Sequence, residues 1–82
     1  MNFQEVLVEV KKGRSDNETS KRLGITRQSF SNYKHSKGMP SETTLKRIAI
    51  VAELPLMAVF LAAYAEKIED EAIKKEMQIL AS

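Results

Sequence analysis

The chain of 82 residues contains no cysteine and no tryptophan, and it has only two prolines and three glycines. Without cysteine it forms no disulfide and no thiolate metal site. The single histidine, His35, has no second type of metal ligand clustered near it, so we expect a solvated side chain. The sequence also lacks a pair of acids, a nucleophile–base set and a phosphate-binding glycine loop. We therefore predict neither an enzyme nor a bound metal or cofactor.

A long uninterrupted apolar run is missing as well. Glu53 and Pro55 break the longest apolar stretch, residues 48–65, which predicts the end of one helix and the start of another rather than a membrane span. The first ten residues do not combine a basic segment with an apolar one, so we expect no signal peptide and a cytoplasmic protein. With 43% apolar residues, the chain predicts one small globular domain with a modest core.

Charges are distributed unevenly along the chain. Residues 1–10 carry two acids and no base, residues 11–47 carry ten bases and three acids, and residues 48–82 carry three bases and six acids. The net charge of +2 therefore hides a basic middle segment between two acidic ones. This distribution favours a face that binds a polyanion, and a plain solubilising surface is the alternative.

Apolar spacing and capping residues predict an all-α chain of five or six short helices. Residues 3–10 carry a helical apolar stripe, Asn2 with Glu5 matches a capping box, and Gly13 fits the position just beyond the helix. The same valine-rich stretch also fits a strand. A fourth helix follows Ser41, with a buried stripe at Leu45, Ile48, Ala49 and Ala52. A fifth begins at Pro55 and covers residues 56–66, and a last amphipathic segment follows Asp70.

Two predicted helices meet at Gly24. Ser15 with Glu18 forms a second capping box, Gly24 ends this helix, and Thr26 caps a third helix over residues 27–34. Gly24 permits a sharp turn, Ser20 is small where the two helices cross, and apolar side chains fill the angle between them. This arrangement is typical of a helix-turn-helix, whose second helix lies in the major groove of DNA.

The third helix carries polar groups on the side away from its core anchor, Phe30. At about 100° per residue, Gln28 and Asn32 point away from this ring, flanked by Arg27 and Ser31. Arg suits the two acceptors of guanine, Gln and Asn suit the donor–acceptor pair of adenine, and Ser suits either base. We predict these four residues as base readers. The alternatives are ordinary surface polar groups and, for Arg27, a phosphate contact alone.

Residues 15–61 resemble the helix-turn-helix domain of phage repressors of the Cro and lambda-repressor type. The residues that carry this resemblance are Ser20, Leu23 to Tyr33, Gly38, Pro40, Ser41, Leu45, Ala49 and Leu54 to Leu56. The tail from Val59 to Ala65, with its closing helix, is similar to small regulators of filamentous phages and their prophages. The resemblance implies a five-helix bundle, a dimer and operator binding that represses transcription. One position departs from the pattern: Thr19 replaces the usual aliphatic residue, so its hydroxyl must find a partner.

The resemblance also implies which residues meet the DNA backbone. The start of the third helix should bind a phosphate through its amides, and basic residues in the flanking segments should add further contacts. The expected phosphate contacts are Arg14, Asn17, Thr26, Lys37 and Lys46.

The fifth helix is apolar nearly all round, which indicates burial on every side. We expect a second copy of the chain to cover the apolar surface of this helix that one chain leaves exposed. The same partner should cover an apolar stripe on the last helix. The predicted dimer contacts are Phe60, Tyr64, Ile73, Met77 and Leu80. The alternative is that the last helix folds back within one chain. We accordingly expect a DNA-binding domain at residues 1–66 and a C-terminal helix for dimerisation or packing at 67–82.

The sequence therefore predicts a sequence-specific DNA-binding repressor of the phage or prophage type, which binds double-stranded DNA at an inverted repeat as a homodimer. The alternative is a protein-interaction module, such as an antitoxin or antirepressor, that binds a regulatory protein partner. The acidic and apolar C-terminal end favours this alternative. An activator or excision factor would share the same groove contacts.

Overall fold

The computed structural model describes residues 1–81, and these residues form six helices and no strand. The helices are α1 (Phe3–Lys11), α2 (Asp16–Leu23), α3 (Arg27–Lys34), α4 (Glu42–Ala52), α5 (Leu56–Ala65) and α6 (Glu71–Leu80). The all-α prediction is confirmed, and the stretch that also fitted a strand is the helix α1. Ser82, the last residue of the predicted C-terminal segment, lies outside the described residues.

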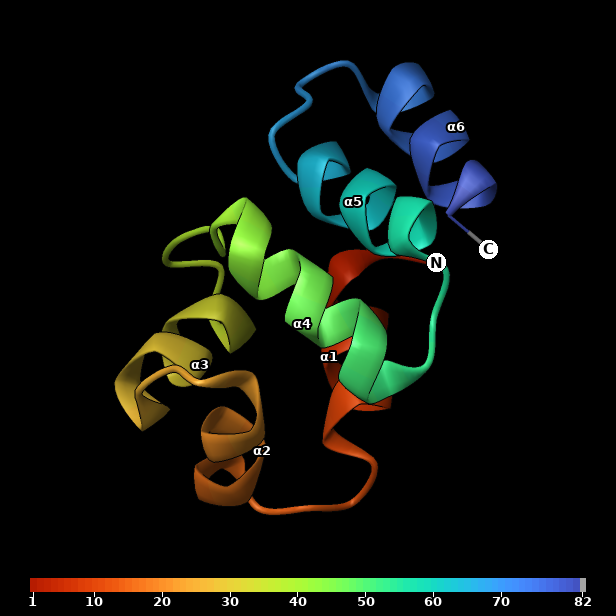
Figure 1. The fold of residues 1–82 in the computed structure, drawn as a ribbon. Coiled ribbons are helices and arrows are strands. Elements are labelled where there is room, and N and C mark those ends of the chain that lie inside the picture. Colours follow the sequence, from red (N-terminus) through yellow and green to blue (C-terminus); the bar gives the residue numbers. More distant parts are fainter. Residues whose placement is uncertain (82) are drawn as a thin grey trace.

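The helices divide into two pairs with α1 and α4 between them (Figure 1). The α2–α3 pair lies at one end of the molecule and the α5–α6 pair at the other. α1 packs against α2, α4 and α5, and α4 packs against α2 and α5. The largest fully buried apolar side chains are Val6, Val10, Leu23, Phe30, Leu45, Ile48 and Val59. The core therefore runs from the α2–α3 pair through α1 and α4 to α5.

The first helix has the capping box that its sequence predicts. The Asn2 side chain accepts a hydrogen bond from the Glu5 amide at 2.8 Å, and the Asn2 amide donates to the Glu5 carboxylate at 2.9 Å. The end of α1 differs from the prediction by one residue. Lys12 occupies the C-cap with a left-handed φ of 47°, and Gly13 follows with a φ of 78°. Two consecutive left-handed residues reverse the chain towards α2, and glycine takes this conformation at little cost.

The predicted capping box at the start of α2 is only half formed. The Ser15 side chain accepts from the Glu18 amide at 3.1 Å, as expected. The Glu18 carboxylate, however, does not return to Ser15 and instead lies 3.7 Å from the Arg22 guanidinium. An ion pair one helical turn ahead has replaced the reciprocal hydrogen bond.

α5 begins and ends differently from the other helices. Pro55 is its N-cap and supplies no side-chain hydrogen bond, because proline has neither a polar side chain nor an amide hydrogen. The helix ends at Ala65, one residue before the predicted end, and Glu66 is its C-cap. Five of its residues are buried: Ala58, Val59, Ala62, Ala63 and Ala65. Burial of small side chains, rather than capping, therefore holds this helix.

α6 folds back onto α5 within the same chain. Asp70 caps its start by accepting from the amides of Ala72 and Ile73 at 2.9 and 3.1 Å. The α-amino group of Met1 donates to the Gln78 carbonyl near its other end. α6 itself has no buried residue. It therefore adds a peripheral layer rather than a central part of the core.

None of the helices formed by residues 1–81 is both long and apolar enough to span a membrane.

Candidate nucleic-acid interface

The turn between α2 and α3 is built around Gly24. This residue is the C-cap of α2 with a left-handed φ of 69°, and the Ile25 amide bonds back to the Ser20 carbonyl at 3.0 Å. The turn thus requires a positive φ at residue 24, and the sequence predicted this from the glycine. The next residue but one, Thr26, already caps α3, so the two helices are joined by a short, fixed connection.

Arg47 of α4 packs over this turn, and no sequence pattern singled it out. Its Nη1 donates to the Leu23 carbonyl at 3.2 Å, where the last carbonyls of α2 lack helical partners. A Cβ added at Gly24 would lie 2.4 Å from the same nitrogen. The left-handed φ therefore favours glycine at this position, and an added Cβ would also displace the flexible end of the Arg47 side chain.

The buried side of the α2–α3 pair is partly polar, and each buried hydroxyl has a partner. Thr19 is fully buried, and its hydroxyl donates to the Ser15 carbonyl at 2.9 Å. Ser20 is 2% exposed and donates to the Asn17 carbonyl at 2.8 Å. Phe30 is fully buried and anchors α3 in the core. The departure at Thr19 is therefore accommodated, because the hydroxyl finds the partner that it requires.

The start of α3 is capped and turned towards solvent. The Thr26 hydroxyl oxygen accepts from the Ser29 amide at 3.0 Å, and the same hydroxyl donates to the Ser29 hydroxyl at 2.9 Å. The cap leaves the first amides of the helix, those of Arg27 and Gln28, without an intrahelical acceptor. Unpaired amides and the positive end of the helix dipole together favour an anion at this position.

The four predicted base-reading residues lie on one side of α3. Arg27 and Gln28 are exposed, while Ser31 and Asn32 are half-buried. Arg27, Gln28 and Ser31 line one shallow surface hollow. The Gln28 Nε2 donates to the Asn32 Oδ1 at 3.0 Å, so these two amides are joined in the free protein. Three of the four therefore line one hollow, and the fourth, Asn32, is bonded to Gln28, while Phe30 is buried in the core.

The predicted phosphate contacts fall into two groups. Four of them are exposed: Asn17 and Thr26 at the starts of α2 and α3, Lys37 in the α3–α4 loop and Lys46 on α4. Arg14 is half-buried, and its guanidinium donates to the Val10 carbonyl of α1 at 3.2 Å. In Figure 1 the α1–α2 loop that holds Arg14 and the α3–α4 loop that holds Lys37 lie at opposite ends of the α2–α3 pair. Arg14 is thus engaged by its own chain, as is Thr26 through its capping hydrogen bonds.

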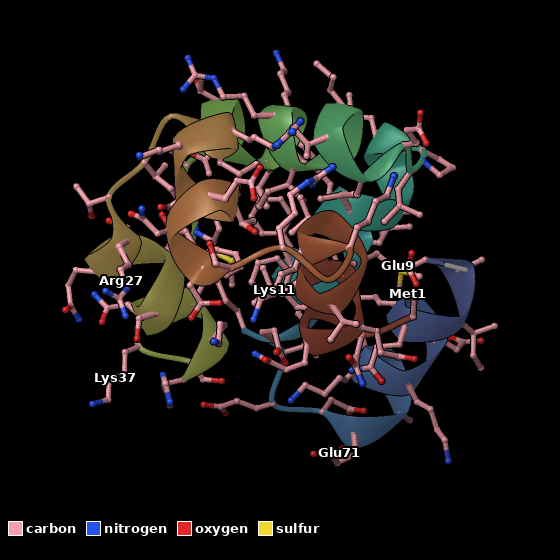
Figure 2. All side chains as sticks on the ribbon, turned by 90° about the horizontal axis from the view of Figure 1, so that it is seen from below. Met1, Glu9, Lys11, Arg27, Lys37 and Glu71 are labelled. Carbon is pink, nitrogen blue, oxygen red and sulfur yellow. The ribbon has the colours of Figure 1, made fainter. Side chains whose placement is uncertain are left out.

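Some of the exposed charged side chains of opposite sign lie on different sides of the molecule. Figure 2 shows Arg27 and Lys37 at one side, while Glu9 and Glu71 lie towards the other, near α6. This arrangement places Arg27 and Lys37 on the α3 side and leaves Glu9 and Glu71 away from it. A polyanion that approached Arg27 and Lys37 would therefore stay clear of these two acids.

A cluster of three charges joins α1, α2 and α3. The Asp16 carboxylate lies 2.9 Å from the Lys11 Nζ and accepts a hydrogen bond from the Lys34 Nζ at 2.7 Å. The bond from Lys34, with the second contact from Lys11, holds the pKa of Asp16 below its ordinary value of 3.8. The Lys34 ammonium also lies 5.9 Å from the centre of the Phe30 ring. Lys34 is therefore used to fix the last turn of α3.

Two further residues of this region have local roles. Tyr33 is half-buried against the core, and burial raises the pKa of its hydroxyl. His35 is exposed, and its Nδ1 donates to the Ser31 carbonyl at 2.8 Å at the end of α3. Residues 1–81 contain no cluster of three or more side chains suited to a metal ion.

The predicted dimer contacts divide between covered and exposed positions. Phe60 and Tyr64 are half-buried against the core, with ring centres 5.8 Å apart, and Met77 is half-buried on α6. Ile73 and Leu80 are 52% and 70% exposed. Since α6 folds back on α5, it covers part of the apolar surface within one chain, which was the alternative interpretation. The exposed residues of α6 remain open to a partner.

A second set of exposed apolar residues lies where α4 meets α5. Ile50, Leu56 and Met57 are 75%, 44% and 64% exposed. Ile50 and Leu56 line a hollow of about 300 Å³ together with Lys46, Ala49 and Leu54. The sequence indicated that α5 carries more apolar surface than one chain can cover, but it did not identify this junction.

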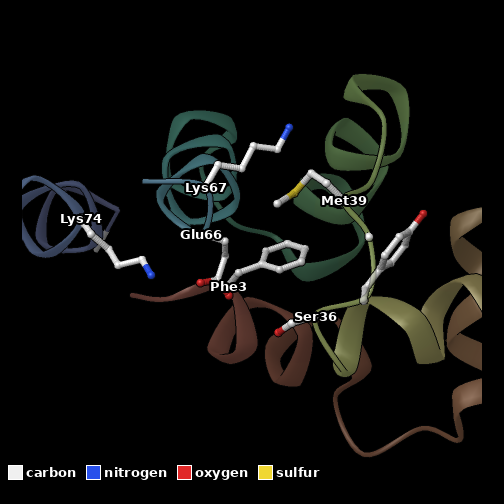
Figure 3. Close-up of a pocket in the computed structure, with 8 residues that line it drawn as sticks. Phe3, Ser36, Met39, Glu66, Lys67 and Lys74 are labelled. Atoms are coloured by element: carbon white, nitrogen blue, oxygen red, sulfur yellow. The ribbon is translucent and has the colours of Figure 1, made fainter. Parts of the chain in front are cut away.

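A larger hollow of about 550 Å³ lies between α1, the α3–α4 loop and the loop that precedes α6 (Figure 3). Its lining is mixed: Phe3 and Met39 are apolar, while Glu66, Lys67 and Lys74 are charged. The Lys67 ammonium lies 5.7 Å from the centre of the Tyr64 ring. This hollow separates the segment that leaves α3 from the C-terminal helix pair.

No protein-family model matches the chain, and comparisons with curated proteins and with solved structures find no match to it.

Proposed function

We propose that this chain is a sequence-specific DNA-binding regulator of transcription, a repressor of the phage or prophage type. In this proposal α2, the turn at Gly24 and α3 form a helix-turn-helix, and α3 enters the major groove. The observation that carries the proposal is the start of α3. Arg27 and Gln28 stand exposed on a capped helix that Phe30 anchors in the core.

The chemistry of this surface suits a duplex in two ways. Guanidinium and amide groups match the acceptors and donors that base pairs present in the major groove. Unpaired helix amides near Thr26 and the exposed lysines Lys37 and Lys46 suit phosphates, which fix the register of the protein on the duplex. Glu9 and Glu71 lie away from this side, which supports the same orientation.

We further propose that the chain binds its operator as a homodimer. A two-fold axis would place the two α3 helices about 34 Å apart, so that they read an inverted repeat. Exposed apolar residues on α6 and at the α4–α5 junction support such an association, because a small domain gains by covering them.

The proposal is tested by selection of bound duplexes from a random pool at several salt concentrations. An inverted repeat should be enriched, and Gln28→Ala should relax the preference for bases within it. Lys37→Ala should weaken all duplexes alike and reduce the salt dependence of log K by about one unit. A pool from which no sequence is enriched at any salt concentration would overturn the proposal.

A second candidate function is a protein-interaction module, such as an antitoxin or antirepressor. The observation that favours it is α6, which exposes Ile73, Ile79 and Leu80 on a helix attached by one face. Acidic residues at the start of this helix would suit a basic partner. Salt separates the two functions, since groove binding weakens steeply with salt and an apolar contact does not.

A further inference from the structure

The hydrogen bond between Gln28 and Asn32 makes the orientations of the two amides depend on each other. The Gln28 Nε2 donates to the Asn32 Oδ1 at 3.0 Å, one helical turn along α3. A side-chain amide can otherwise turn its oxygen and nitrogen to either side, since the two ends have nearly the same shape. The contact couples the two orientations, because turning either amide alone would place donor against donor or acceptor against acceptor.

The bond leaves a complete donor–acceptor pair on Gln28. Its amide nitrogen has two hydrogens, of which Asn32 takes one, and its oxygen Oε1 remains available. Adenine presents an N7 acceptor and an N6 donor in the major groove, the complement of one amide. Asn32, by contrast, is half-buried on a shorter side chain, and its oxygen is already engaged.

We propose that Gln28 and Asn32 act as one unit, in which Gln28 binds a single adenine and Asn32 positions the Gln28 amide. The inference rests on the proposed DNA-binding function and makes it specific, since it assigns one A·T base pair in each half-site to this unit. Asn32 is then a positioning residue. Two independent readers would instead contact two different base pairs.

The test begins with the duplex selected by the wild-type chain. Binding is measured by fluorescence anisotropy for the wild type, Gln28→Ala, Asn32→Ala, the double variant and Asn32→Asp. Each variant is compared on the selected duplex, on duplexes with the adenine replaced by each other base, and on a duplex with 7-deazaadenine in its place. The last duplex removes only the N7 acceptor. Lys75→Ala, an exposed position on α6, is the matched control.

We expect both alanine variants to lose discrimination at the same base pair, by roughly 5- to 150-fold, and the double variant to lose no more. The wild type should discriminate against 7-deazaadenine, and Gln28→Ala should not. Asn32→Asp should keep the adenine preference, because a carboxylate also accepts from the Gln28 Nε2, although its charge lowers the affinity for every duplex. A residue that serves only to hold the fold would not show this rescue.

Two results would overturn the inference and leave DNA binding intact. One is that the alanine variants alter different base pairs with additive effects. The other is that Asn32→Asp loses the preference as fully as Asn32→Ala. Failure to select any duplex would instead reject the proposed function, and the inference would fall with it. Thermal unfolding followed by circular dichroism establishes that each variant is folded.

Discussion

The two helix pairs at the ends of the molecule are held together in different ways. In the α2–α3 pair only Leu23 and Phe30 are fully buried apolar side chains, and hydroxyl caps, a left-handed glycine and an ion cluster supply the remaining constraints. In the α5–α6 pair, α5 carries no charged residue and no side-chain cap and buries mainly alanine. The α2–α3 pair is defined by directional polar contacts, whereas α5 is held by burial of small apolar groups.

This difference indicates what each pair can tolerate. Directional contacts fix the position of α3 closely, but each one depends on a particular residue type. Burial of alanines holds α5 with little directional preference, and it leaves large apolar residues exposed on the outer side of α6. A helix that presents groups to a ligand needs the first kind of support, whereas a helix that only completes a core is served by the second.

The largest expected effect is the loss of the aromatic anchor of α3. Phe30→Ala should lower the free energy of unfolding by about 3–5 kcal/mol, because it removes a fully buried ring and leaves a cavity. Phe60→Ala, in the half-buried ring of the α5–α6 pair, should cost less. Urea unfolding of both variants gives the two values. A larger loss for Phe60→Ala would mean that the α2–α3 pair depends less on its core than we infer.

The next effect separates the two reasons for glycine at position 24. Gly24→Ala should cost about 1–2 kcal/mol for its left-handed φ and a further amount for displacing Arg47. Gly13→Ala is the matched control, because it has a positive φ of 78° and no atom within 4 Å of the added Cβ. In an Arg47→Ala background the extra cost at position 24 should disappear. Equal losses at positions 13 and 24 would contradict the role given to Arg47.

A smaller effect depends on pH. The pKa of Asp16 is lower in the folded chain than in the unfolded one, so its contribution to stability is present above the unfolded value of about 3.8. This contribution is lost as the pH falls through the lower, folded pKa. Asp16→Asn should flatten the decline of stability in acid and cost about 1 kcal/mol or less at pH 7. Thermal unfolding between pH 2 and 7 tests this, and unchanged acid sensitivity would contradict it.

The smallest effect on folding concerns the exposed apolar residues. Leu80→Gln on α6 and Ile50→Gln at the α4–α5 junction should each change monomer stability by about 0.5 kcal/mol or less. One of the two should nevertheless shift a dimer to monomer in sedimentation equilibrium. The variant that does so identifies which apolar set forms the dimer interface. A dimer that survives both changes would contradict an interface at either set.

The course of the chain could be predicted closely from the sequence because local chemistry sets most helix boundaries. Ser15, Thr26, Ser41 and Asp70 each cap the helix that they were expected to start, and Gly24 ends α2 as predicted. The errors are of one residue at the ends of α1 and α5. At these ends, non-glycine residues complete the helix, and their conformation depends on contacts that the sequence does not display.

The candidate site was predictable only in part. Helical geometry was enough to place Gln28 and Asn32 on the side away from Phe30. The hydrogen bond between the two amides and the position of Arg47 over Gly24 depend on rotamers and on tertiary packing. The same holds for the ion pair of Lys34 with Asp16, which joins α3 to α2.

The position of the Phe30 ring affects how the sequence of such a chain can diverge in evolution. Because this ring sits on the inner side of α3, the residues that fasten the helix and the residues that it displays form separate sets. Exchanges among the displayed residues alter little inside the molecule, so related chains are free to diverge in target while they keep the same scaffold. Under the proposed DNA-binding function, transplanting Arg27, Gln28, Ser31 and Asn32 onto another such chain should carry the target preference with them.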